Sequence, residues 1–128
     1  MASILKSLRL LSDDTRLRLL LLLRQEELSV AELQEILGMG QSRISSHLAQ
    51  LRSGSLVTDR RAGKNIYYAV APEALPQEIN RLLDIAALEL SETKSDGRGL
   101  EVVRRKRADL SREYFNRMAG RFGRTYCP

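Results

Sequence analysis

The feature that most constrains the fold of this chain is a pair of amphipathic segments joined by the three residues Gly-Met-Gly. The first segment begins at Ser29, a residue type that caps helices, and continues with inward-facing apolar residues from Ala31 to Leu37. Gly38 suits the left-handed conformation that ends a helix. The second segment runs from about Gln41 to Ser53, and its apolar residues recur four and three positions apart, at Ile44, Leu48 and Leu51. These patterns predict two helices joined by a tight turn.

From Leu56 onward the hydrophobic pattern is typical of strands. The sequence LVTDRRAGKNIYYAV has β-branched and aromatic residues on both sides of a short connection that contains Gly63 and Asn65. Such residues favour strands, and Gly and Asn favour a hairpin turn. A hairpin directly after two helices joined by a tight turn makes a winged helix-turn-helix, in which the second helix enters the major groove of DNA. We therefore predict a mainly α-helical fold with a small β-hairpin.

Three more helices are predicted around this unit. Residues 3–11 have the apolar spacing of an amphipathic helix. Ser12 is the expected N-cap of the next helix, which carries acidic residues in its first turn and runs to about Gln25. The leucine-rich centre of that helix predicts the most buried helix of the fold. Pro72 is expected to end the second strand, and residues 73–92 are predicted to form a long helix whose inward-facing apolar residues include Leu82.

Charge and composition divide the chain into two parts. The sequence SETKSDGRG, residues 91–99, has the composition of a linker. Residues 1–97 carry 12 Lys and Arg against 13 Asp and Glu, whereas residues 98–128 carry 9 against 3. We predict a winged helix-turn-helix domain for DNA binding and dimerisation at residues 1–97, and a basic helical tail or interdomain linker at residues 98–128.

The basic run at residues 104–107 allows two interpretations. It could add non-specific DNA affinity by releasing counterions from the duplex. Alternatively, it is the solvated side of a linker helix that docks on a further domain through its apolar residues. The second interpretation is favoured because the apolar stripe of the tail needs a partner; this stripe is formed by Val102, Val103, Leu110, Tyr114 and Phe115.

Candidate DNA contacts lie on the second helix of the pair and on the hairpin. Gln, Arg and Ser read base edges or bind phosphates, and basic hairpin residues grip the phosphates or the minor groove beside the site. A plain surface helix with a solvated hairpin is the alternative, as is a winged helix used only for protein–protein contacts. The predicted contact residues are Gln41, Ser42, Arg43, Ser45, Ser46, His47, Arg60, Arg61 and Lys64.

Several classes of function are not expected. His47 is predicted to be a phosphate contact or a buried polar packing residue, because a zinc site needs three or four ligands and the chain has one His and one Cys, Cys127. We therefore expect no metal and no cofactor. The chain shows no nucleophile–base pair and no phosphate-binding loop, so no enzymatic activity is expected. It shows no signal peptide, and the apolar run at residues 19–23 is too short to span a membrane, which predicts a cytoplasmic protein.

Four motifs resemble the arsenical-resistance-repressor (ArsR) family of bacterial winged-helix regulators. They are DDTRLRLL, LSVAEL, QSRISSHL and YYAV, in the order and spacing of that family over roughly residues 3–92. The resemblance implies a homodimer formed through the first helix and the helix at residues 73–92. It further implies binding to an inverted-repeat operator in double-stranded DNA, usually as a repressor, with an effector that releases the DNA.

Two departures from the family pattern bear on that effector. Metal sensors of the family carry a Cys-x-Cys-type motif on the third helix, or His, Asp or Glu ligands on the last helix, and its sulfur sensors use two cysteines. Here the third helix reads SVAELQEIL, the last helix has no His, and the chain has one cysteine.

The tail sequence VVRRKRADLSREYFNRMAGRFGRTYCP adds a second resemblance. It resembles the segment that, in some family members, joins the winged helix to a methyltransferase domain dependent on S-adenosylmethionine. S-adenosylmethionine or S-adenosylhomocysteine is therefore the effector that this resemblance implies. The glycine motif of the methyltransferase is absent from this chain.

Overall fold

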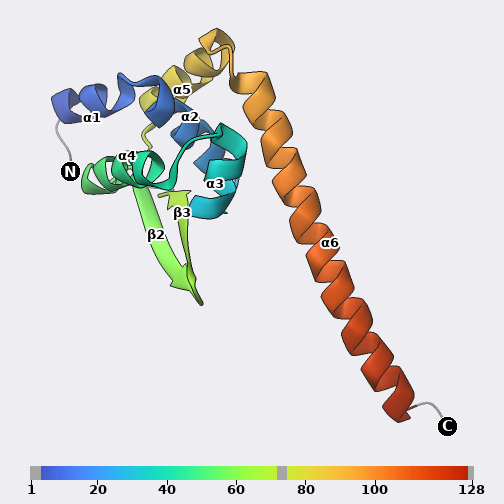
Figure 1. Ribbon diagram of the computed structural model, residues 1–128. Coiled ribbons are helices and arrows are strands. Elements are labelled where there is room, and N and C mark those ends of the chain that lie inside the picture. Colours follow the sequence, from blue (N-terminus) through green and yellow to red (C-terminus); the bar gives the residue numbers. More distant parts are fainter. Residues whose placement is uncertain (1–3, 72–74, 127–128) are drawn as a thin grey trace.

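The computed structural model describes residues 4–71 and 75–126, with side chains up to residue 119 (Figure 1). Within these residues the architecture is mainly α-helical with a small antiparallel sheet, which confirms the predicted fold class. The elements in chain order are α1 (Ile4–Leu11), α2 (Asp14–Leu23), β1 (Leu28–Ser29), α3 (Val30–Leu37), α4 (Gln41–Ser53), β2 (Val57–Ala62), β3 (Asn65–Val70), α5 (Gln77–Glu89) and α6 (Thr93–Tyr126).

Helix α2 is the centre of the hydrophobic core, as its composition predicts. All five leucines of residues 19–23 are buried, and helices α1, α4, α5 and α6 and strand β3 all contact this helix. Because leucines cover almost its whole circumference, the helix needs apolar neighbours on every side. Two of the contacting helices carry fully buried leucines, Leu48 of α4 and Leu83 of α5.

The start of α2 differs by one residue from the prediction, which names Ser12 as the N-cap. The N-cap is Asp13, whose carboxylate accepts a hydrogen bond from the backbone N–H of Arg16 at 3.0 Å. Ser12 instead donates its hydroxyl to the carbonyl oxygen of Arg9 at 2.8 Å and so closes the end of α1. Both residue types can cap a helix, so the residue pattern could not decide between them.

The predicted pair of helices with its tight turn is confirmed. Ser29 forms a capping box with Glu32 at the start of α3, and Gly38 ends that helix in the left-handed conformation with a φ of 66°. Helix α4 covers the predicted residues, and its apolar stripe of Ile44, Leu48 and Leu51 is completely buried. One detail is wrong, because Ala31, predicted to face inward, is exposed.

The predicted hairpin is also present, and a third strand joins it. Strands β2 and β3 pair antiparallel from Val57 opposite Val70 to Ala62 opposite Asn65, and Gly63 turns the chain with a φ of 62°. The two-residue strand β1 pairs with the other edge of β3, which gives the strand order β1-β3-β2. Sequence periodicity could not reveal β1, because two residues carry no periodic signal. The hairpin of β2 and β3 is called the wing below.

Helix α5 is shorter than the helix predicted at residues 73–92. It begins at Gln77, with Pro76 as its N-cap, and ends at Glu89. The predicted strand end at Pro72 lies outside the described residues, as do residues 73–74. Proline fixes its own φ and lacks an N–H group, so Pro76 marks the boundary that the apolar spacing alone did not show.

Helix α6 is the largest difference from the sequence-based prediction. Residues 91–99 were predicted to form a linker, but α6 starts at Thr93 and continues for 34 residues. The reason lies in tertiary contacts at two of the residues that suggested a linker. The buried carboxylate of Asp96 accepts two hydrogen bonds from Arg18, each 2.8 Å long. Gly99 lies so close to Ile36 that an added Cβ atom would come within 3.1 Å of that side chain.

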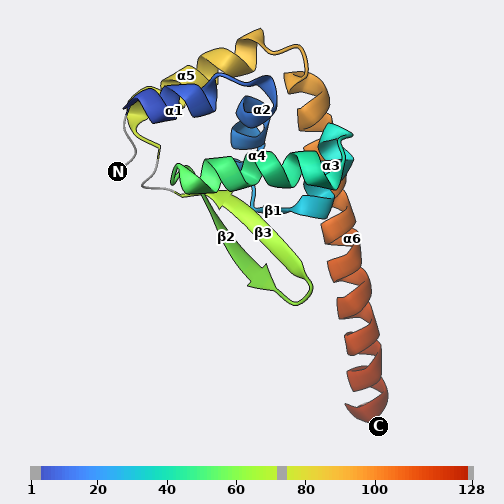
Figure 2. The same cartoon turned by 60° about the vertical axis from the view of Figure 1, so that its left-hand side comes forward.

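The tail is therefore docked on the domain along its first half. Leu100 and Val103 of α6 are part of the hydrophobic core, whereas Leu110, Tyr114 and Phe115 are exposed. Figures 1 and 2 show α6 running beside α3 and continuing past the end of the wing. The division of the chain between residues 97 and 98 remains a prediction, and α6 is continuous across that point.

Helices α1 and α5 lie together at the end of the molecule opposite the wing (Figure 2). Both expose apolar side chains in the single chain, and Leu82, which was predicted to face inward, is 46% exposed. The exposed set is Ile4, Leu5, Leu8, Leu82, Ile85 and Leu88. Among the helices of the described residues, none combines the length and the apolar character needed to cross a membrane.

Candidate nucleic-acid interface

The exposed side of helix α4 is lined by small residues. An α-helix turns by about 100° per residue, so the side opposite the buried stripe is occupied by Ser42, Ser46, Ala49 and Ser53. All four are exposed, and we call them the small-residue stripe. Because these side chains are short, the backbone of α4 can approach a large ligand surface closely.

Longer polar side chains flank the small-residue stripe. Arg43 and Gln50 lie on one flank, and Gln41 and Arg52 lie on the other. Of the predicted contact residues on α4, Gln41, Ser42, Arg43 and Ser46 are exposed. Ser45 is half-buried, and its hydroxyl accepts a hydrogen bond from the side-chain amide of Gln41 at 3.0 Å.

The start of α4 is suited to an anion. Its N-cap is Gly40, which has no side chain to occupy the first backbone N–H groups of the helix. Such N–H groups, at the positive end of the helix dipole, favour a phosphate.

His47 is predicted to contact DNA, but its side chain turns toward α2 and is only 17% exposed. Its Nδ1 atom lies 3.4 Å from Nη1 of Arg16 and 4.0 Å from the carboxylate of Asp13. Burial raises the pKa of Asp13, but the backbone hydrogen bond of Arg16 and the nearby His47 and Arg16 charges lower it further, so that the pKa lies below its usual value. His47 therefore lies partly buried between α4 and α2, and its two predicted roles, a phosphate contact and a polar packing residue, stay predictions.

Arg60 and Arg61 of the wing lie on opposite faces of the sheet, because side chains alternate along a strand. Arg60 stands opposite Tyr67 and donates two hydrogen bonds to Glu27, at 2.8 and 2.6 Å. These hydrogen bonds from Arg60 hold the pKa of the Glu27 carboxyl below its usual value. Arg61 is exposed and makes no hydrogen bond or ion pair with any described residue. Lys64 in the turn is likewise exposed.

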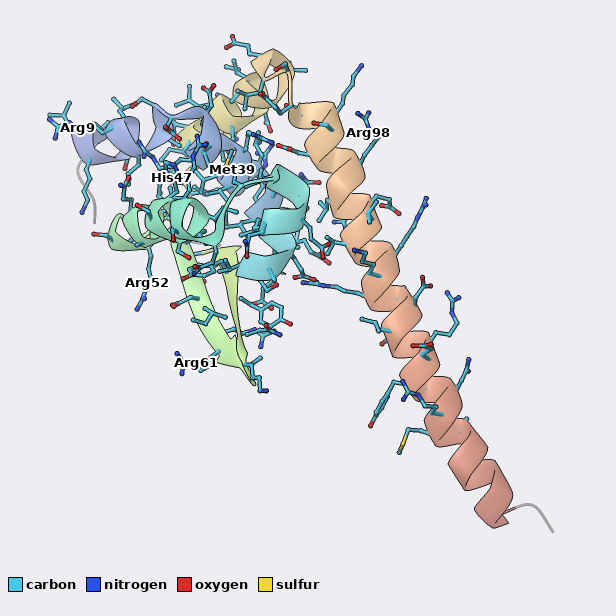
Figure 3. The ribbon with its side chains drawn as sticks, viewed as in Figure 1. Arg9, Met39, His47, Arg52, Arg61 and Arg98 are labelled. Carbon is cyan, nitrogen blue, oxygen red and sulfur yellow. The ribbon has the colours of Figure 1, made fainter. Side chains whose placement is uncertain are left out.

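A partly exposed ion pair connects the wing to helix α4. Asp59 lies on the same face of the wing as Arg61, and its carboxylate is 3.3 Å from Nη1 of Arg52. Figure 3 shows Arg52 and Arg61 on the same side of the molecule. The small-residue stripe and the unpaired charge of Arg61 therefore belong to one surface.

Arg16 contributes to this surface and was not predicted from the sequence. It reaches from α2 to α4, where its Nη1 atom donates to Oε1 of Gln50 at 2.8 Å, and its Nε atom donates to the carbonyl oxygen of Leu10 at 2.8 Å. Arg16 and Gln50 are 34 positions apart in the chain, so no local pattern could have shown this contact. Arg16 thus fixes Gln50 at the edge of the small-residue stripe.

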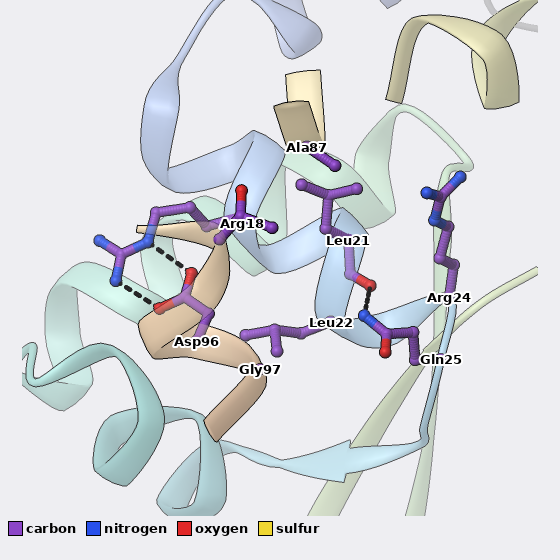
Figure 4. Close-up of a pocket in the computed structure, with 9 residues that line it drawn as sticks. Arg18, Leu21, Leu22, Arg24, Gln25, Ala87, Asp96 and Gly97 are labelled. Atoms are coloured by element: carbon purple, nitrogen blue, oxygen red, sulfur yellow. Dashed lines mark hydrogen bonds and ion pairs between the residues drawn. The ribbon is translucent and has the colours of Figure 1, made fainter. Parts of the chain in front are cut away.

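A small cavity lies where α2, α5 and α6 meet (Figure 4). Its volume is about 80 Å³, and the Arg18–Asp96 ion pair forms part of its wall. The buried hydroxyl of Thr93, which also lines it, has no hydrogen-bond partner among the described residues. Sites for drug-sized ligands measure roughly 300–1,000 Å³, and one water occupies about 30 Å³. The cavity therefore suits a few water molecules and not an effector the size of a nucleoside.

Comparison with known proteins gives the family. Residues 13–59 match the family model described as bacterial regulatory protein, arsR family. The arsenical resistance operon repressor of Escherichia coli is 39% identical to the chain over 79 residues, which cover 61% of this chain and 67% of that protein. The chain belongs to the arsR family. The family and the winged helix-turn-helix fold predicted from the sequence are thereby confirmed.

Two further comparisons show how much of the chain is similar to each of these proteins. The arsenic resistance transcriptional regulator ArsR1 of Pseudomonas putida is 47% identical over 74 residues, so the chain spans 57% of the length of that relative. The homodimeric winged helix-turn-helix DNA-binding domain from Mycobacterium bovis, a solved structure, is 31% identical with a TM-score of 0.56. That match covers 70% of this chain and 79% of the solved one. The predicted relation to methyltransferase fusions is not addressed by these matches and remains a prediction.

Proposed function

We propose that this chain is a dimeric, sequence-specific DNA-binding transcriptional regulator that acts as a repressor. The observation that carries the proposal is the Arg52–Asp59 ion pair, which joins α4 to the wing so that both face one ligand. A polyanion fits this surface, because Arg43, Arg61 and Lys64 are exposed on it without acidic partners among the described residues. The names of two similar proteins, a repressor and a DNA-binding domain, support the same conclusion.

In this proposal α4 enters the major groove and the wing lies along the flanking backbone. The small-residue stripe lets α4 sit deep in the groove, where Arg43 can pair with guanine and Gln41 with adenine. Ser42, Ser45 and Ser46 bind bases or phosphates, and Arg61 and Lys64 bind phosphates or the minor groove. We propose no direct DNA contact for Arg60 and His47, because each already contacts charged residues of its own chain.

A homodimer is the second part of the proposal. The exposed apolar side chains of α1 and α5 form a surface that a second copy of the chain can cover. The similar domain from Mycobacterium bovis is described as homodimeric. A two-fold dimer presents two copies of α4 to the duplex, so the expected operator is an inverted repeat.

The finer features of the proposal concern the tail and the effector. We divide the chain into a DNA-binding and dimerisation domain at residues 1–97 and a tail at residues 98–128 that begins within helix α6. Because the tail sequence resembles the linker of methyltransferase fusions, S-adenosylmethionine and S-adenosylhomocysteine are the first small-molecule effectors to test. Such an effector would bind outside the cavity of Figure 4, which is too small for it.

A fluorescence titration with the duplex upstream of the protein's own gene tests the function. It is run at two salt concentrations, with a random duplex of equal length as the control, and repeated with each of the two effectors. We expect tighter binding to the upstream duplex than to the random one, and a steep loss of affinity for both with added salt. An effector-dependent change in affinity supports the effector class, and no change with either ligand removes both ligands from the proposal.

The alternative is a winged helix that binds another protein and has no role on DNA. The nearly neutral charge of residues 1–97 is the observation in its favour. Equal, weak binding to both duplexes would support this alternative over the repressor. Insensitivity of such binding to salt would strengthen it further, because contacts with phosphates always depend on salt.

A further inference from the structure

Arg107 of helix α6 forms hydrogen bonds and ion pairs with two separate parts of the domain. Its Nε atom donates to the carboxylate of Glu32 at 2.7 Å, and its Nη2 atom donates to the other oxygen of the same carboxylate. Nη2 also donates to the backbone carbonyl oxygen of Glu27 at 2.9 Å, and Nη1 lies 3.5 Å from the carboxylate of Glu26. The guanidinium group therefore connects α6 to the start of α3 and to the segment between α2 and β1.

The same guanidinium group reaches the wing. Arg107 lies 5.9 Å from the centre of the Tyr67 ring, and Arg60 lies 5.1 Å from the same ring. Both distances are within the range of cation–π attraction. Glu27 joins the two arginines, since its carboxylate accepts hydrogen bonds from Arg60 and its carbonyl oxygen accepts one from Arg107.

We propose that Arg107 is a positioning residue for the wing, so that helix α6 belongs to the DNA-binding machinery without touching DNA. Through Tyr67 and Glu27 it fixes one face of the wing, and this orients Arg61 on the opposite face toward the duplex. The DNA part of this inference rests on the proposed function. The mechanical part, that Arg107 holds the wing, does not.

The other basic residues of the run at 104–107 do not account for this role. Lys106 and Arg104 pair with carboxylates of α3 and of the segment after α2, at 3.1 Å from Glu35 and 3.9 Å from Glu26. Arg105 pairs only within α6, with Glu101 at 3.8 Å, and its side chain is 76% exposed. Arg105 is therefore a matched control for Arg107, because it has the same charge on the same helix and no contact with the domain among the described residues.

Amide hydrogen exchange of the full chain without DNA tests the mechanical part. In Arg107→Ala, amides of β2 and β3 should exchange about tenfold faster or more, while amides of α2 keep their wild-type rates. Arg105→Ala should leave both sets unchanged. Equal wing exchange in the wild type and Arg107→Ala overturns the proposal. If α2 also exchanges faster, the same measurement is made on Arg107→Lys, which keeps the charge but loses the planar fork. Faster exchange of β2 and β3 with wild-type exchange of α2 then supports the proposal, and wild-type exchange of the wing overturns it.

A double-mutant cycle with Arg61→Ala tests the DNA part, using the upstream duplex. Arg107→Ala alone should weaken binding roughly fivefold to tenfold, the size expected for residues coupled in one network. In the Arg61→Ala background it should weaken binding less than about twofold, because the group that it orients is gone. Arg107→Lys should not rescue affinity, whereas it would do so if Arg107 bound a phosphate as a simple charge.

The outcomes separate the two proposals. Equal losses from Arg107→Ala in both backgrounds show that Arg107 does not act through Arg61 and overturn the DNA part. Absence of specific binding by the wild-type chain overturns the proposed function instead, and the exchange measurement still decides whether Arg107 holds the wing.

Discussion

At the residue scale, the arginines of this chain differ in whether their guanidinium groups are already paired within the protein. Arg60 and Arg107 donate hydrogen bonds to carboxylates of the same chain. Arg43 and Arg61, in contrast, are exposed and unpaired among the described residues. An exposed, unpaired guanidinium can exchange water for a base edge or a phosphate without losing an internal partner. Under the proposed function, contacts within the protein therefore leave Arg43 and Arg61, rather than Arg60 and Arg107, available to bind DNA.

Arg43 is the residue that we expect to discriminate between sequences. Replacing it with Ala should weaken binding to the upstream duplex by about tenfold or more, because a bidentate Arg–guanine pair contributes roughly 1–3 kcal/mol of discrimination. Binding to a random duplex should weaken much less. Arg98→Ala is the control, since Arg98 is exposed on α6, away from the α4 surface (Figure 3). Equal losses on both duplexes would make Arg43 a phosphate contact.

Residue types were easier to predict than residue partners. The polar face of α4 followed from helical spacing, and the predicted contacts Gln41, Ser42 and Arg43 are exposed. The inward turn of His47 and the pairing of Arg60 did not follow, because both depend on residues far away in the chain, Arg16 and Glu27. Local patterns carry no information on such contacts.

At the scale of elements, the docking of α6 depends on polar residues at its first turns. The Arg18–Asp96 pair is nearly buried, with side chains 12% and 8% exposed. Ser, Thr, Lys, Asp and Gly are typical linker residues, so composition predicted a linker here. A buried ion pair and a close helix contact at Gly99 override that composition, and neither can be recognised before the partner helices are known.

Asp96→Asn should lower the free energy of unfolding by about 3 kcal/mol, because Arg18 would be left buried without its counter-charge. Urea unfolding followed by circular dichroism measures this loss. Asp109→Asn, in the exposed part of the same helix, is the control and should cost no more than about 0.5 kcal/mol, since its pair with Arg112 is solvated. Similar losses for the two variants would show that Arg18–Asp96 does not fasten α6.

Acid should loosen the contact between α6 and α3 through Glu32. Burial raises the pKa of Glu32, but hydrogen bonds from Arg107 and Ser29 lower it further, so that the pKa lies below its usual value. A group with a lowered folded-state pKa stabilises the fold above its unfolded pKa, and this contribution is lost as the pH falls. Stability should therefore fall below about pH 4.3, the usual value for glutamate.

Glu32→Gln tests this pH dependence. Glutamine retains the acceptor that the capping box needs but has no charge for Arg107. The variant should be less stable than the wild type at neutral pH, and the difference should shrink as the pH falls through the acidic range. Thermal unfolding between pH 3 and pH 7 measures the difference, and a constant gap across this range would contradict the role of Glu32.

At the scale of the whole molecule, the single chain leaves the α1–α5 surface uncovered. Leu88 is 89% exposed and Ile85 is 52% exposed, so neither contributes much to the fold of one chain. Such residues support the proposed dimer, because an apolar patch in water is costly unless something covers it. The sequence pattern showed the amphipathic helices but not which of their leucines the single chain would bury.

Leu88→Glu should convert the proposed dimer into a monomer without unfolding it. The side chain is already exposed in the single chain, so the fold should change in stability by about 0.5 kcal/mol or less. Sedimentation velocity measures the mass, and Leu110→Glu, on exposed α6, is the control that should remain dimeric. A dimeric Leu88→Glu, or a monomeric control, would move the interface away from α5.

Helix α6 is long enough to extend well beyond the rest of the domain (Figure 1). A helix of 34 residues is about 50 Å long, and Arg107, near its middle, is the last residue of α6 that is hydrogen-bonded to the rest of the domain among the described residues. The part of α6 beyond Arg107, residues 108–126, is longer than the part at residues 93–106 that lies against the domain. If Arg107 holds the wing as proposed, a sideways displacement of residues 108–126 would act on the wing through this residue. If the proposed function and the proposed role of Arg107 both hold, a displacement of this part of α6 would change the affinity of the protein for DNA.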